Sequence, residues 1–127
     1  MTLPAARLYF APMKASQTIR STVAAWPGIS EAPGQFGAID FKIGEREIGH
    51  LHGDVLLDVP FPRRVRDELV SAGQAEPHHV MPESGWISFR IRRAGDAEHA
   101  VALLKRSYDL ITEQLERRRV QSAAAKR

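Results

Sequence analysis

The chain has 127 residues and a mass of 14.2 kDa, the size of one domain. Hydrophobic residues make up 43% and charged residues 26%, as in soluble globular proteins. No apolar run is long enough to span a membrane, and residues 1–7 lack the pattern of a secretory signal, so we expect a cytoplasmic protein. The absence of cysteine excludes disulfides, thiolate nucleophiles and cysteine-ligated metals.

Positive charge is concentrated at the C-terminal end. The last eleven residues hold five of the 18 Lys and Arg and no acid, so residues 1–116 carry a net charge of −2. A nucleic-acid-binding domain usually carries its positive charge on the folded body. We therefore expect no nucleic-acid partner and interpret the basic tail, residues 117–127, as the solvated end of the last helix.

The first half of the chain predicts one helix followed by an antiparallel meander. Residues 1–14 form a loose lead-in, and Ser16 caps a helix to about Trp26, which Pro27-Gly28 ends. A ragged strand or loop over 30–37 comes next. Three strands at 38–43, 46–52 and 55–59 then follow, separated by turn signals at Gly44-Glu45 and Gly53-Asp54.

The second half predicts a helix, a strand and a long helix. Pro60-Phe61-Pro62 begins a helix that ends at Gly73, residues 85–92 alternate as a strand, and Gly95-Asp96 precedes the last helix. The expected fold class is α+β, in the order α-β-β-β-β-α-β-α, with an antiparallel sheet of four to five strands and helices on one face. We expect one domain over 15–116, with its other sheet face available to a ligand.

Histidines form the first candidate site. His50 and His52 stand two residues apart on one strand, so both rings project from the same face, and Asp54 follows. His78 and His79 lie together in the loop before the last strand. Such a set suits a general base beside an orienting carboxylate, or a metal site of the two-histidine, one-carboxylate type. We expect no resident cofactor or metal and keep the metal site as the alternative.

Arginines near a tryptophan form the second candidate site. Arg90 shares a strand face with Trp86, and Arg63 begins the middle helix. An arginine beside a tryptophan on an open sheet face can hold a carboxylate, phenolate or phosphate. The other interpretation is ion pairing with Asp58 and nearby acids.

Several segments resemble the bacterial luciferase-family proteins, which share a domain with fungal luciferase. The most specific are Glu47-Ile48-Gly49-His50-Leu51-His52 and Glu76-Pro77-His78-His79, and the resemblance spans about residues 26–115. The fungal pattern has a second histidine element where this chain has Val55-Leu56-Leu57, so its light-emitting chemistry is not implied here. A weaker resemblance to YjbR-like proteins, seen at residues 41–44, 85–87 and 107–111, implies a frataxin-like α+β fold.

Together the residues and the resemblance imply a pocket lined by histidine, arginine and tryptophan. The resemblance implies cofactor-independent oxidation or acid–base chemistry on a phenolic or enolic compound. The catalytic candidates are His50, His52 and His78. The substrate-binding candidates are Asp54, Arg63, His79, Trp86 and Arg90. The alternative is a non-enzymatic module that binds nucleic acid or protein, including a homodimer formed through a sheet edge or the last helix.

Overall fold

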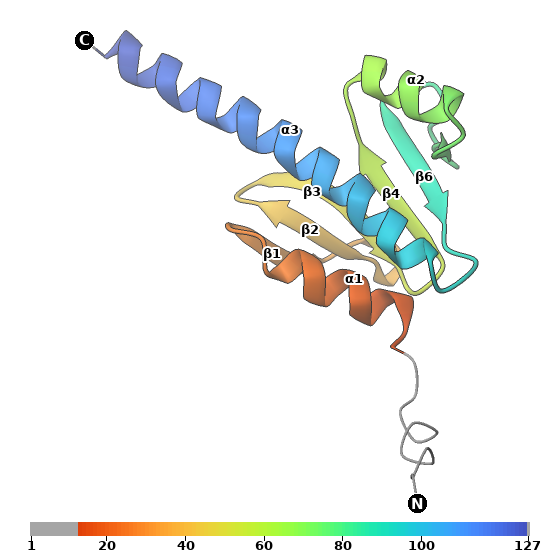
Figure 1. Cartoon of the computed structure of the whole chain (residues 1–127). Coiled ribbons are helices and arrows are strands. Elements are labelled where there is room, and N and C mark those ends of the chain that lie inside the picture. Colours follow the sequence, from red (N-terminus) through yellow and green to blue (C-terminus); the bar gives the residue numbers. More distant parts are fainter. Residues whose placement is uncertain (1–12, 127) are drawn as a thin grey trace, which may run out of the picture.

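A computed structural model describes residues 13–126, and most of the expected lead-in of residues 1–14 lies outside this range. The described residues form both helices and strands (Figure 1). In chain order they are α1 (Ala15–Ala24), β1 (Ile29–Pro33), a 3-10 turn η2 (Gln35–Gly37), β2 (Ile39–Ile43), β3 (Arg46–His52), β4 (Leu56–Pro60), α2 (Arg63–Ser71), β5 (Glu76–Pro77), β6 (Trp86–Arg90) and α3 (Asp96–Ala125).

The strands form one antiparallel sheet in the order β1-β2-β3-β4-β6-β5. The expected α+β class is confirmed, with six strands where four to five were predicted. The additional strand, β5, is two residues long and contains Pro77. A proline is tolerated there because an edge strand leaves one row of N–H groups unpaired.

Two helices cover one face of the sheet. In Figure 1, α3 crosses β3 and β4, and α1 lies beside it over the β1–β2 side. The apolar residues of β3, β4 and β6 pack under these helices, and Leu104 of α3 is fully buried among them. The buried strand residues are Ile48, Leu51, Leu57, Val59 and Ile87. The alternate residues of the same strands therefore face away from the helices.

A bulge interrupts the alternation in β3. Phe41 of β2 pairs with Gly49, but the next residue, Lys42, pairs with Glu47, which leaves Ile48 as the extra residue. Ile48 and Gly49 are both buried. The bulge places Glu47 on the same face as His50, whereas a regular strand would separate residues three apart onto opposite faces.

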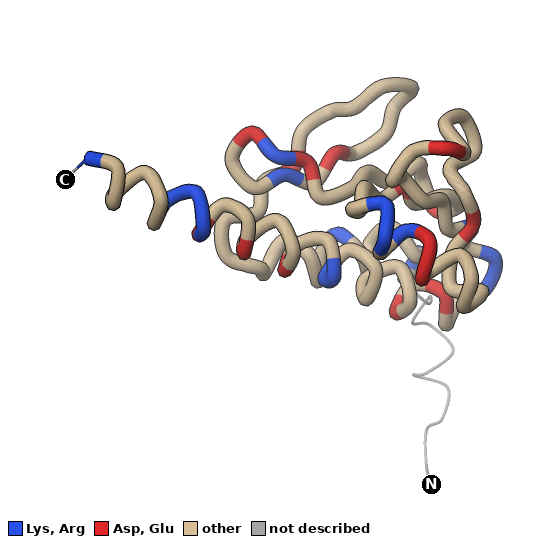
Figure 2. Tube along the Cα trace, turned by 90° about the horizontal axis from the view of Figure 1, so that it is seen from above, with Lys and Arg blue, Asp and Glu red and all other residues tan. Residues whose placement is uncertain are grey.

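The last helix extends well beyond the sheet. Figure 1 shows the C-terminal end of α3 projecting past the other elements, and residues 117–125 of the expected tail are its final turns. Figure 2 shows Lys and Arg on this projecting end. No helix within residues 13–126 is long and apolar enough to cross a membrane.

Candidate functional site

A row of polar side chains crosses four strands on the face away from the helices. Asp40 of β2 lies opposite His50 of β3, His50 lies opposite Asp58 of β4, and Asp58 lies opposite Ser88 of β6. Directly opposite residues in an antiparallel pair share one face and have neighbouring Cβ atoms. The sheet register thus assembles residues that are 48 positions apart in the sequence into one polar floor.

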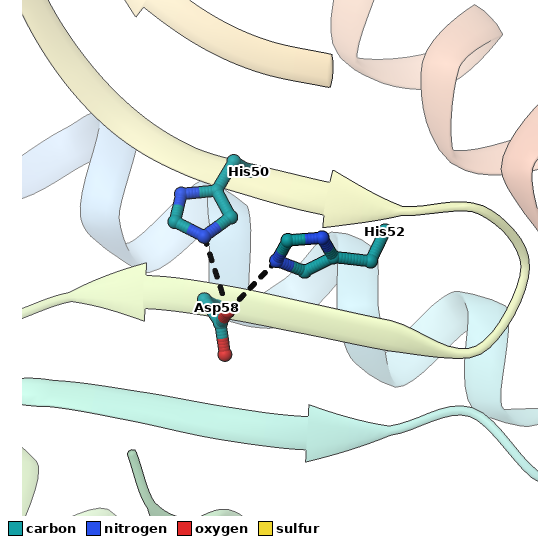
Figure 3. A group of neighbouring side chains, drawn as sticks. All are labelled: His50, His52 and Asp58. Atoms are coloured by element: carbon teal, nitrogen blue, oxygen red, sulfur yellow. Dashed lines mark hydrogen bonds and ion pairs between the residues drawn. The ribbon is translucent and has the colours of Figure 1, made fainter. Parts of the chain in front are cut away.

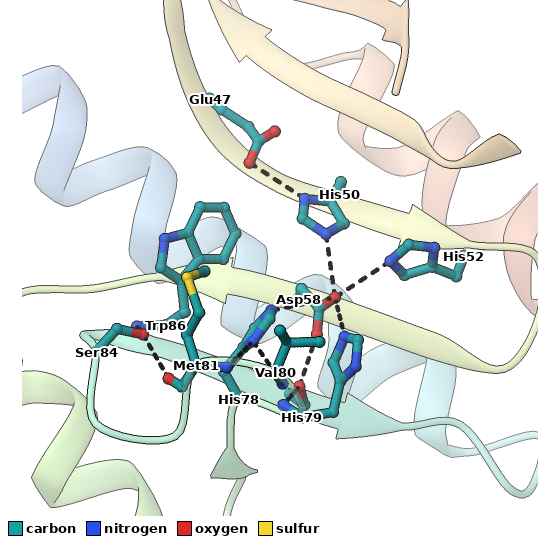
Figure 4. Close-up of polar contacts among 11 residues, drawn as sticks. Glu47, His50, His52, Asp58, His78, His79, Val80, Met81, Ser84 and Trp86 are labelled. Carbon is teal, nitrogen blue, oxygen red and sulfur yellow. Dashed lines mark hydrogen bonds and ion pairs between the residues drawn. The ribbon is translucent and has the colours of Figure 1, made fainter. Parts of the chain in front are cut away.

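Asp58 is the centre of this floor and is completely buried. Its Oδ1 atom accepts a hydrogen bond of 2.7 Å from Ser88 Oγ. Its Oδ2 atom lies 3.0 Å from His50 Nε2, 3.2 Å from His52 Nε2 and 3.0 Å from His79 Nε2 (Figure 4). A buried carboxylate is costly unless it is paired, and these contacts provide the pairing. We call His50, His52, His78, His79 and Asp58 the histidine cluster.

His50 lies between two carboxylates. Its Nδ1 atom is 3.2 Å from Glu47 Oε2, while Nε2 faces Asp58. Burial lowers the pKa of His50, but the hydrogen bonds that its ring donates to Asp58 and Glu47 outweigh burial and raise its pKa to about 9. Burial likewise raises the pKa of Asp58, but hydrogen bonds from His50, Ser88 and His79 hold that pKa well below its usual range.

The loop after β5 carries the other two histidines. His78 Nδ1 accepts hydrogen bonds from the backbone N–H groups of Val80 (3.1 Å) and Met81 (3.0 Å). In the neutral ring the proton is then on Nε2, which lies 3.6 Å from Asp58 Oδ2. Burial lowers the pKa of His78 and so favours this neutral form. The loop is tied to the sheet because the backbone N–H of His79 donates to Ser88 Oγ at 3.1 Å.

A cavity of about 520 Å³ opens above the polar floor. Its other walls are largely apolar, and Trp86 stands with its ring centre 5.3 Å from that of His50. Phe36 lines the cavity although 95% of its surface is exposed, and its φ of 56° is in the left-handed region. The lining residues are Gln35, Phe36, Ala38, Asp40, Glu47, His50, His52, Asp58, His78, His79, Val80, Met81 and Trp86. Among these described residues none is Lys or Arg.

The structure brings five of the expected site residues together in this cavity and places three elsewhere. The five are His50, His52, His78, His79 and Trp86. Asp54 instead accepts a 2.9 Å hydrogen bond from the backbone N–H of Ser16, which fixes the start of α1. Arg63 donates to the carbonyl of Glu83 in the neighbouring loop, and Arg90 is exposed at the end of β6.

Four polar residues near the site were not assigned a site role from the sequence, namely Asp40, Glu47, Asp58 and Ser88. Asp58 gave a usable signal, because a single carboxylate in the apolar run Leu56-Leu57-Asp58-Val59 needs a buried partner. From the sequence alone, Asp58 is interpreted only as an ion-pair partner for arginine. Glu47 gave no such signal, because its orientation depends on the bulge at Ile48.

Several of these groups have the composition of a metal site. The ligand atoms of His50, His52 and Asp58 all lie within 4.8 Å of one another (Figure 3). The same holds for Asp58, His78 and His79, and for Asp40, Glu47 and His50. Imidazole nitrogens and carboxylate oxygens can also exchange protons with a bound molecule.

The fold and site define an α+β domain with a ligand-sized cavity on the helix-free face of its sheet. The family model described as the Luciferase domain matches residues 45–107, which run from the turn before β3 into α3. Over these residues the chain belongs to the luciferase domain family, as its resemblance implied. The matched range includes the whole histidine cluster. Comparison with curated proteins and with solved structures gives no match.

Proposed function

We propose that this luciferase domain binds a phenolic or enolic small molecule in the cavity and promotes loss of its acidic hydroxyl proton. The observation that carries the proposal is the convergence of four histidine rings on Asp58 at the floor of a cavity with apolar walls. A cavity of about 520 Å³ falls in the range of sites for small organic ligands.

The walls of the cavity suit a ligand with a flat, apolar ring. The Trp86 and Phe36 rings and the Met81 thioether line the cavity. Aromatic and thioether side chains contact planar rings favourably. A molecule that rests on these groups would direct a polar hydroxyl toward Asp58 and the histidines, since ligands align their polar atoms with the polar groups of a site.

The floor suits a hydroxyl that ionises. Arg90, the expected anion partner, lies outside the cavity, so the negative charge has to be stabilised by the histidine cluster or by a cation bound within it. Acid–base chemistry is the proposed class of reaction because a ring nitrogen of the histidine cluster can accept the hydroxyl proton as a general base.

The test uses chromophoric probes, 4-nitrophenol and 4-hydroxycoumarin, whose neutral and ionised forms absorb differently. We expect saturable binding and a bound probe whose apparent pKa is below its value in water. His52→Ala should weaken binding at least tenfold, while the matched variant His99→Gln, which changes a histidine of α3 outside the cavity, should not. Absence of saturable binding, or equal binding by His52→Ala and the wild type, would contradict the proposal.

A further inference from the structure

We propose that His50, His52 and Asp58 bind one divalent ion of the first transition series, with open coordination positions directed into the cavity. Such an ion would supply the positive charge that the proposed function needs at the floor. The inference rests on the proposed function only for the role of the ion, because the metal site itself follows from the distances and lone pairs of the ligand atoms.

Distances between the ligand atoms match those in a metal site. The Asp58 Oδ2 atom lies 3.0 Å from His50 Nε2 and 3.2 Å from His52 Nε2 (Figure 3). Bonds of about 2.1 Å from a metal to nitrogen or oxygen separate two neighbouring ligand atoms by about 3.0 Å at a right angle and about 3.4 Å in a tetrahedron. The two distances from Asp58 Oδ2 allow an ion to contact Asp58 together with either histidine, and the ligand atoms of all three residues lie within 4.8 Å of one another.

The available lone pairs favour this triad over the group of Asp58, His78 and His79. His78 already uses its Nδ1 lone pair to accept two backbone hydrogen bonds, so its neutral ring presents N–H, and not a ligand atom, to Asp58. His50 has the opposite arrangement. Its Nδ1 can donate to Glu47, which leaves the Nε2 lone pair free for a metal.

Outer contacts hold two of the three ligands, His50 and Asp58, in place. Metal-ligating histidines generally donate their second nitrogen to a carboxylate or carbonyl, as His50 can to Glu47. Asp58 is fixed through its other oxygen by Ser88, and His79 approaches Oδ2 at 3.0 Å from the loop side. The site thus has supported ligands, which random surface histidines lack.

Charge and donor type identify the class of ion. The lining contains the three carboxylates of Asp40, Glu47 and Asp58 and no Lys or Arg among the described residues, so a cation is favoured. Two imidazoles and one carboxylate suit Zn²⁺, Co²⁺, Ni²⁺ or Fe²⁺, whereas Mg²⁺ and Ca²⁺ prefer oxygen ligands throughout. A triad with free positions also leaves room for the oxygen of a bound molecule.

The test is a titration of untagged, chelator-treated full-length protein with Co²⁺, followed by its visible absorption, and competition with Zn²⁺. We expect one equivalent to bind and to produce absorption bands typical of a nitrogen- and oxygen-ligated ion. Loss of an outer-shell partner alone costs about 10- to 100-fold in affinity, so loss of a ligand in His52→Ala should cost at least about 100-fold. The control, His99→Gln, should bind as the wild type does.

His52 is suitable for this substitution because its side chain is 24% exposed and its removal leaves the apolar core intact. If neither Co²⁺ nor Zn²⁺ binds at one equivalent, or if His52→Ala binds as tightly as the wild type, the metal site is wrong. Repeating the phenol titration in excess chelator separates the two proposals. Binding of the probe without metal binding overturns only the metal site, and metal binding without binding of any probe overturns only the small-molecule function.

Discussion

The side chains of Glu47 and His50 meet at 3.2 Å although they are three residues apart on one strand. Ile48, the extra residue of the bulge, turns Glu47 to the face where His50 lies. The Nδ1 atom of His50 thereby has the carboxylate of Glu47 as its partner, while its Nε2 atom faces Asp58.

Replacing Glu47 by Gln should lower the pKa of His50. In the wild type, burial lowers this pKa, but the hydrogen bonds that the ring donates to Asp58 and Glu47 outweigh burial and raise it to about 9. Loss of one carboxylate should move the pKa toward the ordinary value of 6.5. A titration of the ring resonances by NMR, in chelator, measures the change, and an unchanged His50 pKa would contradict the assigned contact.

The pH dependence of stability should show the contribution of His50. A histidine whose folded pKa is raised stabilises the fold fully below pH 6.5 and loses this contribution as the pH rises to about 9. Because the ring keeps some contact with solvent, we expect a loss of about 1–2 kcal/mol, less than the full shift implies. Urea unfolding of metal-free wild type and His50→Gln across this range should give curves that converge at the alkaline end.

Substituting Asp58 by Asn should destabilise the protein strongly. The change removes the charge from a fully buried group that faces four histidines, and breaking a buried pair from one side costs about 3–5 kcal/mol. Urea unfolding at pH 7 measures this loss. The matched change, Asp109→Asn, affects an exposed pair with Lys105 and should cost less than about 1 kcal/mol. Equal effects would show that Asp58 is not held as described.

A side chain at Gly49 should force the sheet and α3 apart. A Cβ atom there would lie 2.6 Å from Leu104 Cδ2 and 3.0 Å from the carbonyl oxygen of Asp58. We expect Gly49→Ala to cost about 1–3 kcal/mol through overpacking. Gly95→Ala is the control, because a Cβ atom at Gly95 meets nothing within 4 Å. Thermal unfolding compares the two variants.

Removing residues 117–127 should leave the cavity intact. The described residues of this segment are exposed, and they lie on the projecting end of α3, far from β4 (Figures 1 and 2). We expect the truncated protein to bind probe and Co²⁺ within about twofold of the full chain. A larger loss would show that the last turns of α3 contribute to the site.

Local patterns were sufficient to predict most of the fold. Alternation identified β2 and β6, and turn signals delimited β3 and β4. An apolar stripe from Ala97 to Leu115, with apolar residues every three or four positions, identified α3. The two residues of β5 are too few to show a period. The apolar stripe ends at Leu115 and gives no end point for α3, because the final turns to Ala125 bury no apolar face.

The site was only partly predictable because it depends on register. Spacing along one strand placed His50 and His52 together, but nothing local indicated that Asp58 pairs opposite His50. Arg90 does lie on the face where Trp86 and Ser88 lie, as the alternation predicted. It pairs with Leu56 near the end of β4 and is exposed there, beyond the residues that line the cavity.

At position 36, the stability of the fold and the recognition of a ligand favour different residues. The left-handed backbone conformation of Phe36 costs about 1–2 kcal/mol, and its exposed ring regains little of this by packing. Selection of variants for heat resistance alone should therefore favour glycine or asparagine at this position. Selection for retention of an aromatic ligand should preserve the ring. If one library were screened separately for heat resistance and for ligand retention, the selected sequences would differ first at position 36, at the mouth of the cavity. The residues of the polar floor would stay the same in both.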